Sequence, residues 1–379
     1  MRPTVALINL SNLKKNYLNI RMKVGPARIM AVVKADAYGH GAKEIVSAFN
    51  SLGNKKPEYY AVSICDEAVE LRKRKVKQPI LVFEPFEKSE AEEVFRYNLI
   101  STVFEEEHLN ILLKAKRKFE GKKSSSKKTK IHIKVDTGMN RLGVRYEESF
   151  KFVEKLNRNK NFLIDGIYTH FATSDELNKD FADFQLKRFK NLLKDLREKN
   201  INYGLAHAAN SGAILDMPGS YFDMVRPGMI LYGYHPSTET TESFPLYPVM
   251  SIISRVASIK EIKPEETVGY GRIFTATQKT KIASVPIGYA DGFNRNLSNK
   301  AKAIINGKIY NEVGRVSMDR ITLDVKHDDV KVGDKVTLIG KDNGREICAW
   351  DWCKELNTIP YEITCGISNR VPRIYKNYK

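Results

Sequence analysis

Several features that mark other protein classes are missing from this chain of 379 residues. No uncharged apolar stretch approaches the ~20 residues of a membrane-spanning helix, and the polar N-terminus lacks a secretory signal. Four cysteines are too few for a disulfide scaffold, and none forms a Cys-x-x-Cys pair, which argues against a zinc site and dithiol chemistry. These absences predict a cytoplasmic protein with no membrane partner and no metal.

Common cofactor motifs are absent, and acidic residues are outnumbered by basic ones. The chain has no G-x-G-x-x-G, no G-x-x-x-x-G-K and no H-E-x-x-H. Its 63 Lys and Arg residues outnumber 45 Asp and Glu, which gives a net charge of +18. The excess is dispersed lysine without the interleaved aromatic residues of a base-reading surface. We therefore expect a solvated lysine-rich surface and no nucleic-acid partner.

What is present is a repeating pattern of short apolar, β-branched runs, and all but the last are followed by a segment that can form an amphipathic helix. Continuous apolar runs are typical of strands buried on both faces, as in a parallel sheet. Eight such steps favour a closed (β/α)₈ TIM-type barrel over an open sheet. The predicted strands cover residues 29–33, 59–64, 80–83, 99–104, 131–135, 162–168, 203–205 and 222–225, with helices expected over 66–75, 105–118 and 181–199.

The pattern breaks at residues 235–248, HPSTETTESFPLYP, whose composition and lack of periodicity indicate a linker. Beyond it, short alternating runs separated by turns predict a mostly-β domain, with Asn306-Gly307 as a hairpin tip. We therefore predict an α/β barrel domain over residues 1–238 and a β-rich C-terminal domain over 239–379. The Lys/Ser tract over residues 121–130 is expected to form a mobile surface loop.

In such a barrel the functional side chains follow the C-terminal ends of the strands. Lys34 ends the first run, where a desolvated lysine can supply a free amine as nucleophile or base. Strand five delivers Lys134 and Arg141, and strand six delivers His170. The alternatives are a solvated surface lysine, a surface turn with a structural Arg–Asp pair, and a satisfied core histidine.

Two small-residue turns follow strands seven and eight. HAANSG (207–212) opens a helix whose N–H groups can hold a phosphate, and RPGM (226–229) follows the eighth strand. Ser211 and Gly228 are therefore well placed for a phosphate site. A lysine at the mouth opposite such a site predicts pyridoxal 5′-phosphate (PLP), bound through a Schiff base to Lys34.

An ordered set of motifs covers both domains. VVKADAYGHG, KVDTGMNRLGV, THFATSDE, HAANSG, VRPGMILYG, GYGRIF, IGYADGF, GRVSMDR and PYEITCGISNRVPR resemble bacterial alanine racemase. The resemblance runs from about Ile29 to Tyr375. It implies a homodimeric PLP enzyme that interconverts L- and D-alanine by two-base proton transfer and supplies D-alanine for peptidoglycan. It also implies active sites shared between the two subunits.

The resemblance assigns roles to individual residues. Lys34 would form the internal aldimine and serve one face of the substrate, and Tyr270 of the partner subunit would serve the other. A tyrosine base needs positive charge nearby, which His207 and Arg226 can supply. The cofactor would contact Tyr38, His170, Asn210, Ser211, Arg226, Gly228, Met229 and Tyr361. The substrate carboxylate would contact Arg141 and Met318 of the partner subunit, and Lys134 (if carbamylated), His207, Asp319 and Tyr289 would support the site.

Arg226 bears on the type of reaction. Facing the pyridine nitrogen, its guanidinium would keep that nitrogen unprotonated, weaken the electron sink and suppress transamination. A PLP-dependent decarboxylase with a similar barrel would favour an acidic group there, so that alternative ranks lower. A serine racemase or a broad-specificity amino-acid racemase stays open, because the size of the pocket depends on packing.

Overall fold

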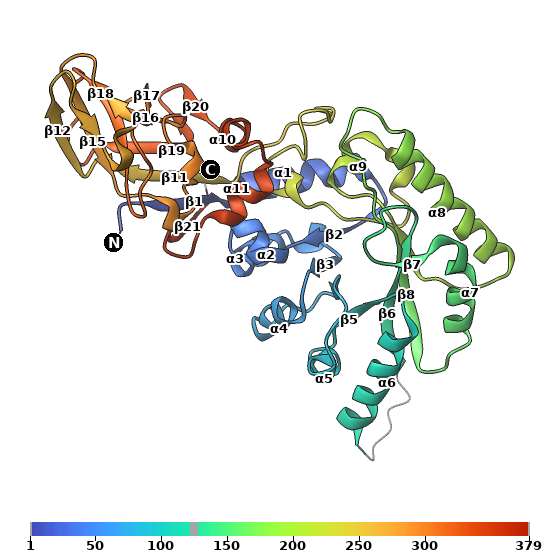
Figure 1. The fold of residues 1–379 in the computed structure, drawn as a ribbon. Helices are drawn as coiled ribbons and strands as arrows, with labels where there is room; N and C mark the ends of the chain where they lie inside the picture. The colour runs from blue at the N-terminus through green and yellow to red at the C-terminus, as the bar shows by residue number, and fades with distance from the viewer. Residues whose placement is uncertain (1, 122–127, 378–379) are drawn as a thin grey trace.

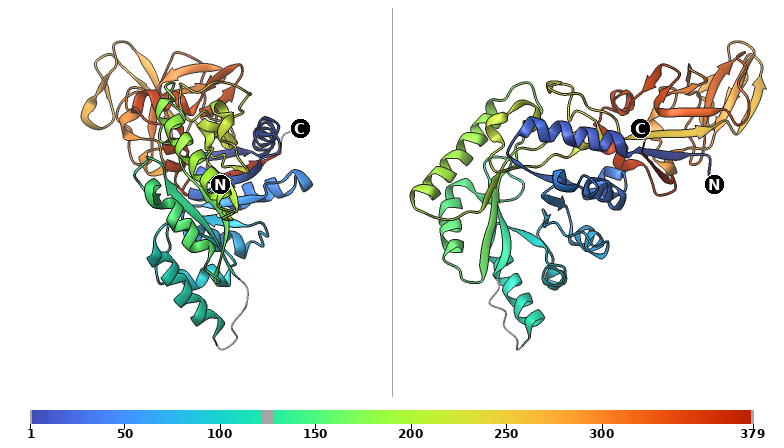
Figure 2. Two further views of the ribbon diagram at one scale, coloured as in Figure 1. Left: turned by 90° about the vertical axis from the view of Figure 1, so that its right-hand side faces the viewer. Right: turned by 180° about the vertical axis from the view of Figure 1, so that it is seen from behind.

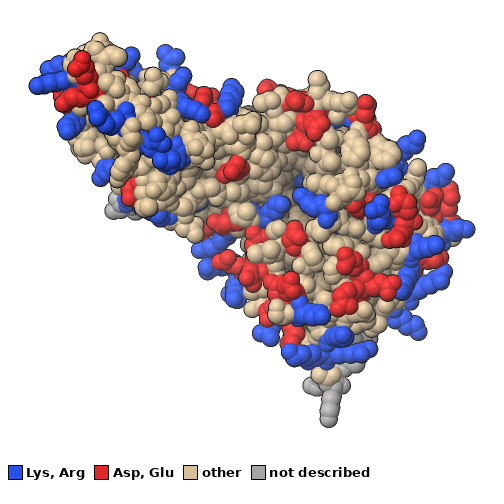
Figure 3. Space-filling view, viewed as in Figure 1, with Lys and Arg blue, Asp and Glu red and all other residues tan. Residues whose placement is uncertain are grey.

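The computed structural model describes residues 2–121 and 128–377. Most of the predicted Lys/Ser loop, residues 122–127, lies outside the described residues. The chain forms two lobes, a barrel and a β-rich domain that projects to one side of it (Figure 1). Within the described ranges, no helix combines the length and apolar character needed to cross a membrane. Lys and Arg side chains are spread over both lobes and are interspersed with Asp and Glu (Figure 3).

The predicted eight-stranded parallel barrel is confirmed. Neighbouring strands pair in the order β5-β4-β3-β2-β10-β9-β8-β6, and pairing of β5 with β6 closes the ring. Most strand side chains are buried, because the inner face fills the barrel core and the outer face packs under helices. The strands are β2 (Arg28–Val32), β3 (Tyr59–Val62), β4 (Ile80–Val82), β5 (Ile100–Val103), β6 (Thr129–Asp136), β8 (Phe162–Tyr168), β9 (Leu205–His207) and β10 (Met224–Val225), and β7 (Val144–Arg145) pairs with the end of β6.

The seventh strand lies two residues later than predicted. The apolar run over 203–205 suggested a strand there, but β9 begins only at Leu205. Gly204 has a φ of +68° and its N–H donates to the Asn202 side chain at 3.0 Å. This turn holds Tyr203 outside the sheet, so the strand begins after Gly204 and runs from Leu205 to His207.

Helices cover the outside of the barrel. The helices expected over 66–75, 105–118 and 181–199 are present as α4 (Cys65–Lys73), α6 (Glu106–Glu120) and α8 (Asp180–Glu198). The N-terminal helix α1 (Leu10–Val24) buries Leu13, Tyr17, Ile20 and Val24 along one face, and it lies against α3, α9 and the turn Met229–Tyr232 that follows β10. The other barrel helices are α2 (Lys34–Gly39), α3 (Ala42–Asn50), α5 (Ala91–Arg96), α7 (Tyr146–Asn157) and α9 (Ser211–Asp216).

The second domain is mostly β. One sheet has the order β17-β16-β19-β11-β1-β21 with β20 on β19, a second has the order β12-β15-β18, and β13 pairs with β14. The predicted Asn306-Gly307 tip is confirmed, since it joins β16 and β17 with positive φ at both residues. The elements are β11 (Met250–Arg255), β12 (Ser258–Ile262), β13 (Thr267–Val268), β14 (Phe274–Thr275), β15 (Thr280–Val285), β16 (Lys302–Ile305), β17 (Lys308–Asn311), β18 (Ile321–Lys326), β19 (Lys335–Asp342), β20 (Arg345–Ile347), α10 (Ala349–Leu356), α11 (Pro360–Gly366) and β21 (Arg373–Lys376).

The start of the chain differs from the predicted division at residue 238. Strand β1 (Val5–Asn9) does not join the barrel, because it pairs antiparallel with β11 and parallel with β21 in the second domain. Arg2 extends this attachment with two 2.6 Å hydrogen bonds to the buried Asp291 carboxylate. Seen from behind, the chain runs from β1 in the second lobe into α1, which lies along the barrel (Figure 2).

The second domain also contacts the mouth of the barrel. Helix α11 packs against α2, where a Cβ placed on Gly39 would lie 2.2 Å from the Thr364 carbonyl oxygen. The predicted linker has no regular structure and is held to α1 by paired hydrogen bonds between Asn16 and the backbone of Tyr247. The mouth is therefore bounded by both domains.

Candidate active site

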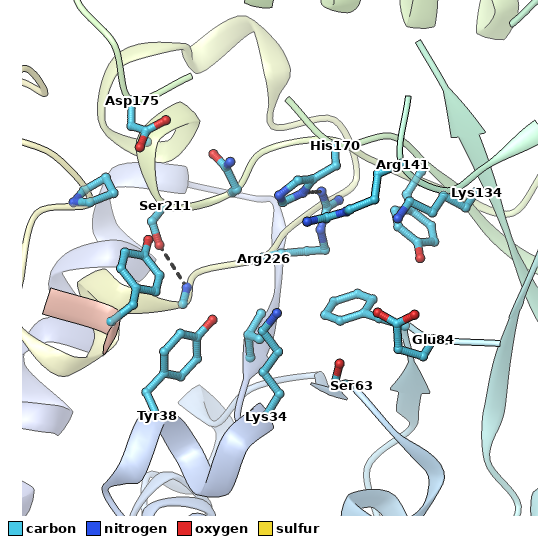
Figure 4. Close-up of a pocket in the computed structure, with 18 residues that line it drawn as sticks. Lys34, Tyr38, Ser63, Glu84, Lys134, Arg141, His170, Asp175, Ser211 and Arg226 are labelled. Atoms are coloured by element: carbon cyan, nitrogen blue, oxygen red, sulfur yellow. Dashed lines mark hydrogen bonds between the residues drawn. The ribbon is translucent and has the colours of Figure 1, made fainter. Parts of the chain in front are cut away.

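A cavity of about 270 Å³ lies at the C-terminal ends of the barrel strands. It brings together ten of the residues expected from the sequence: Lys34, Tyr38, Lys134, Arg141, His170, Asn210, Ser211, Arg226, Gly228 and Tyr361. Lys34 and Tyr38 enter from below, from the end of β2 and from α2, and Arg226 and His170 lie across the cavity (Figure 4). Met229 and His207 are fully buried beside this group.

The turn that follows Lys34 is left-handed. Ala35, Asp36, Ala37 and Tyr38 all have φ between 50° and 55°. For L-residues this conformation costs roughly 1–2 kcal/mol each. Several contacts offset the cost: Glu67 accepts from the Ala35 N–H, and Asp36 accepts from the Ala42 N–H at the start of α3. The turn leaves Lys34 half-buried at the cavity and Tyr38 buried beside it.

A second side of the cavity is built for a small polar group. The Gly228 N–H donates to Ser211 Oγ at 3.0 Å, and the Tyr38 and Tyr361 rings lie 5.7 Å apart. A Cβ on Gly228 would come within 2.6 Å of the Tyr38 hydroxyl oxygen, so only glycine allows this approach. Burial raises the pKa of both tyrosines, which keeps their hydroxyls available as donors at neutral pH.

Arg226 is buried and held by hydrogen bonds from both of its terminal nitrogens. Its Nη2 donates to the carbonyl oxygens of Thr169 (2.7 Å) and Ala208 (2.8 Å), and His170 Nδ1 lies 3.3 Å from it. Burial lowers the pKa of Arg226 to about 10. The guanidinium therefore stays positively charged at neutral pH.

A chain of hydrogen bonds continues from Arg226 into the barrel core. Arg226 Nη1 donates to His207 Nδ1 at 2.8 Å, and His207 Nε2 lies 2.9 Å from His132 Nδ1. His132 Nε2 lies 3.5 Å from Asp165, which also pairs with Lys130 at 2.6 Å. Burial first, and then the charge of Arg226, lowers the pKa of His207 well below its ordinary value. Since arginine only donates, a neutral His207 must accept at Nδ1 and donate from Nε2.

Lys134 and Arg141 form the cationic wall of the cavity. Burial, and after it the nearby positive charges of Arg141 and Arg226, lower the pKa of Lys134 to about 8. A substantial fraction of the Lys134 amine is therefore neutral at mildly alkaline pH.

Four expected residues do not reach this cavity within the chain. Tyr270, Met318 and Tyr289 are 73%, 52% and 42% exposed on the second domain. Asp319 is also exposed, and it pairs with Arg370 at 2.6 Å. The structure of one chain therefore assembles the barrel side of the expected site and leaves the second-domain residues at the surface.

The cavity also includes residues that the sequence reasoning missed. Ser63 and the pair Phe83–Glu84 line it. Glu84 follows the predicted strand over 80–83, so the strand-end rule would have found it. Ser63 and Phe83 lie inside the predicted strands and reach the mouth because β3 ends at Val62 and β4 at Val82. Asp175 comes from the loop after β8, and Pro236, from the linker, gave no signal of a role at the mouth. The remaining lining residues are Val32, Tyr168 and Gly212.

Comparisons with known proteins agree in both halves of the chain. Residues 8–236 match the family model "Alanine racemase, N-terminal domain" and residues 249–375 match "Alanine racemase, C-terminal domain". Alanine racemase 2 of Caldanaerobacter subterraneus is 41% identical over 99% of this chain and 95% of that protein. The alanine racemase of Halothermothrix orenii is 42% identical over 99% of this chain and 97% of its own.

Solved structures give the same picture. Alanine racemase of Clostridium difficile 630 superposes with a TM-score of 0.92 and 36% identity, covering 99% of this chain and 96% of that one. The crystal structure of alanine racemase from E. faecalis gives a TM-score of 0.91 and 34% identity, covering 99% and 98%. The similarity thus extends over the barrel, the second domain and their junction.

Proposed function

This chain belongs to the alanine racemase family, and from that premise we propose that it interconverts L- and D-alanine with PLP as cofactor. The observation that carries the proposal is the single cavity in which Lys34, Arg226 and the Ser211–Gly228 turn meet. A serine or decarboxylase activity has no particular observation in its favour. D-alanine is a building block of peptidoglycan, so we place the product in cell-wall synthesis.

The residues around the cavity fit PLP. The Lys34 amine would hold the cofactor covalently, and Ser211 Oγ, the Gly228 backbone and the hydroxyls of Tyr38 and Tyr361 would hold its phosphate. The close approach permitted by glycine at 228 supports this role, since a side chain there would fill the space. Asn210, His170 and Met229 would complete the contacts. When bound, PLP supplies the electron sink that makes the α-proton of an amino acid removable.

Two bases on opposite faces of the substrate are sufficient for racemisation, because a proton leaves one face and another arrives on the other. Lys34 would act on one face from the barrel. Tyr270 would act on the other face, from the partner subunit. The exposure of Tyr270 in the single chain, together with that of Met318 and Tyr289, supports a homodimer in which each second domain caps the partner's barrel.

Arg226 would face the pyridine nitrogen. Its permanent positive charge and its lack of any acceptor mean that it donates a hydrogen bond and gives up no proton. The nitrogen would then remain neutral, and the reacting carbon would carry the negative charge only briefly. This role explains why an arginine is buried at the cavity with two carbonyl oxygens and two histidines holding it in place.

Arg141 would bind the substrate carboxylate together with Met318 of the partner subunit. We also propose that Lys134 is carbamylated: its neutral amine would attack CO₂ and lose a proton, leaving an anion that orients Arg141. The lowered pKa of Lys134, about 8, supports this reaction because only the neutral amine is nucleophilic. His207, Asp319 and Tyr289 would support the site without contacting the reacting atoms.

The direct test is to follow D-alanine formation from L-alanine by purified protein, with and without added PLP. We expect PLP-dependent conversion that approaches an equal mixture of the two enantiomers. Borohydride reduction followed by peptide mapping should label Lys34, and Lys34→Ala should abolish both the label and the activity. Racemisation of serine in preference to alanine, or a label on another lysine, would contradict the proposal.

A further inference from the structure

Two neighbouring loops of the second domain carry the residues that we assign to the partner's site. The tyrosine loop, residues 269–273, carries Tyr270, and the methionine loop, residues 314–318, carries Met318. Arg315 Nε donates to the Tyr270 carbonyl oxygen at 3.3 Å. Since the Tyr270 side chain is 73% exposed, its position within the chain depends on what holds the backbone of its loop.

Asn299 joins these two loops through its side-chain amide. Its Nδ2 donates to the Ile273 carbonyl oxygen in the tyrosine loop at 3.1 Å. Its Oδ1 accepts from the Gly314 N–H at the head of the methionine loop at 2.6 Å. One planar amide therefore sets the spacing of the two loops.

A buried side chain of the second domain anchors the backbone of Asn299. Its backbone N–H donates to Glu312 Oε2 at 2.6 Å, and Glu312 is only 1% exposed. Glu312 is itself anchored because its N–H donates to the Ala301 carbonyl oxygen at 2.8 Å. The second carboxyl oxygen of Glu312 has no partner among the described residues. The backbone of Asn299 is thus anchored to a buried group of the domain, and its side-chain amide reaches from there to the two loops.

We propose that Asn299 is a positioning residue that sets the place of Tyr270 for proton transfer in the partner's site. The inference rests on the proposed function, because it takes Tyr270 as one of the two bases. Proton transfer is sensitive to distance, and a 1 Å misplacement of a reacting group can slow a reaction by roughly 100-fold. Asn299 acts through Ile273 on the loop and contacts no reacting atom.

The test variant is Asn299→Asp. Asn299 has a φ of +60°, a conformation that aspartate also tolerates. The substitution keeps an oxygen for the Gly314 N–H but replaces the donor that faces the Ile273 carbonyl with a second oxygen. It therefore breaks the link to the tyrosine loop and leaves the link to the methionine loop. Asn343→Asp makes the same change at another left-handed residue, in the turn between β19 and β20, and is the matched control.

The measurement uses the PLP-loaded dimer with α-deuterated L- and D-alanine. We expect Asn299→Asp to lower kcat by roughly 10–100-fold while KM changes little, and Asn343→Asp to behave as wild type. The isotope effect on kcat should rise in the direction in which Tyr270 removes the α-proton, because that step becomes slower. In the other direction, Lys34 removes the deuteron and Tyr270 then returns a proton. The isotope effect on kcat should fall in that direction, because the slower, unlabelled return of the proton limits the rate.

The isotope effects separate positioning from loss of folded protein, since less active enzyme lowers both rates and leaves both isotope effects unchanged. Such an equal loss, or full activity of Asn299→Asp, would overturn the inference. If Asn299→Asp does not fold, Asn299→Gly frees both loops without backbone strain and should show the same opposite changes together with a raised KM. Tyr270→Phe gives the reference: if it racemises normally, the proposed function fails, whereas an inactive Tyr270→Phe beside a normal Asn299→Asp rejects only the role of Asn299.

Discussion

At the scale of single residues, a buried arginine determines the direction of the hydrogen bonds around it. Arg226 only donates, so the hydrogen-bond direction is set along His207 and His132 as far as Asp165. Hydrogen bonds from His132 and Lys130 outweigh burial and hold the pKa of Asp165 below its usual range. The negatively charged Asp165 at one end of this hydrogen-bond chain thus balances the positively charged Arg226 at the cavity.

We predict that Arg226→Glu changes the type of reaction. A carboxyl group facing the pyridine nitrogen would favour its protonation and strengthen the electron sink, so the carbanion would live longer. Racemisation should fall by about 100-fold or more, and the fraction of turnovers ending in transamination should rise. The measurement is pyruvate release and loss of the cofactor's absorbance in the presence of alanine. Normal racemisation with no added pyruvate would show that Arg226 does not control the reaction type.

We also predict that carbamylation of Lys134 depends on pH. Because the pKa of Lys134 is about 8, its amine is mostly protonated at pH 6 and mostly neutral at pH 9. Occupancy at a fixed concentration of dissolved CO₂ should therefore rise across this range. ¹³C NMR of the protein equilibrated with ¹³CO₂ measures the carbamate signal, and Lys134→Arg is the control. A signal that is equally strong in Lys134→Arg would place the carbamate on another amine.

At the scale of elements, the sequence predicted the regular parts of the fold better than the special ones. The run Phe162–Tyr168 located its strand to the residue, and the other apolar runs located barrel strands to within one or two residues at most ends. The left-handed turn over Ala35–Tyr38 was not predicted, since ADAY has no glycine in it to signal positive φ. Its conformation is imposed by tertiary contacts, which no local pattern records. Cavity residues that directly follow a predicted strand, such as Lys34 and Arg226, were predictable once the strands were located.

Replacing Ala35 with glycine should relieve this turn. Ala35 is exposed with a φ of +50°, so removing its Cβ relieves roughly 1–2 kcal/mol of backbone strain. Greater freedom of the unfolded chain offsets about 0.4–1 kcal/mol of this gain. We expect Ala35→Gly to be slightly more stable by chemical denaturation, and Ala48→Gly in the right-handed helix α3 to be less stable by about 1 kcal/mol. Equal destabilisation by both variants would mean that the turn is not strained.

Glu312 should make the stability of the protein depend on pH. Burial raises the pKa of Glu312 from 4.5 to about 8. Between these values the folded protein holds a proton that the unfolded chain has lost, so stability falls as pH rises, by up to about 1.36 kcal/mol per pH unit. Glu312→Gln keeps an acceptor for the Asn299 N–H and cannot ionise. Its gain in unfolding free energy over wild type should be small at pH 5 and reach a few kcal/mol at pH 8–9, whereas parallel pH profiles would exclude this ionisation.

At the scale of the whole molecule, one chain places one of its two proposed bases at the barrel cavity and leaves the other exposed on the second domain. The barrel cavity holds Lys34, and the exposed loops of the second domain hold Tyr270 and Met318. The sequence indicated two domains and a linker, but it did not show that β1 pairs in the second domain. The residues VALIN suit either sheet, and only the distant partners β11 and β21 decide between them.

Mixed dimers should recover activity that neither parent has. Lys34→Ala and Tyr270→Ala should each be nearly inactive in racemisation. After the two are unfolded and refolded together in equal amounts, half of the dimers should be mixed, and half of the sites in each mixed dimer should be intact. We expect about a quarter of wild-type activity, as two-fold symmetry requires. Size-exclusion chromatography checks dimer formation, and mixed dimers without activity would place both bases on one chain.

Strand β1 has a consequence for how the protein is made. It leaves the ribosome before the barrel strands, yet Val5 pairs with Ile253 and Ala6 pairs with Arg373. The barrel can close while β1 still has no partner, and the sheet of the second domain is complete only after β21 has been synthesised. Between these events an apolar strand is exposed beside a folded barrel, where it is open to pairing with other chains. A strand that is synthesised before the barrel is thus buried only after it, and the interval before β11 and β21 emerge is when this protein is most open to aggregation.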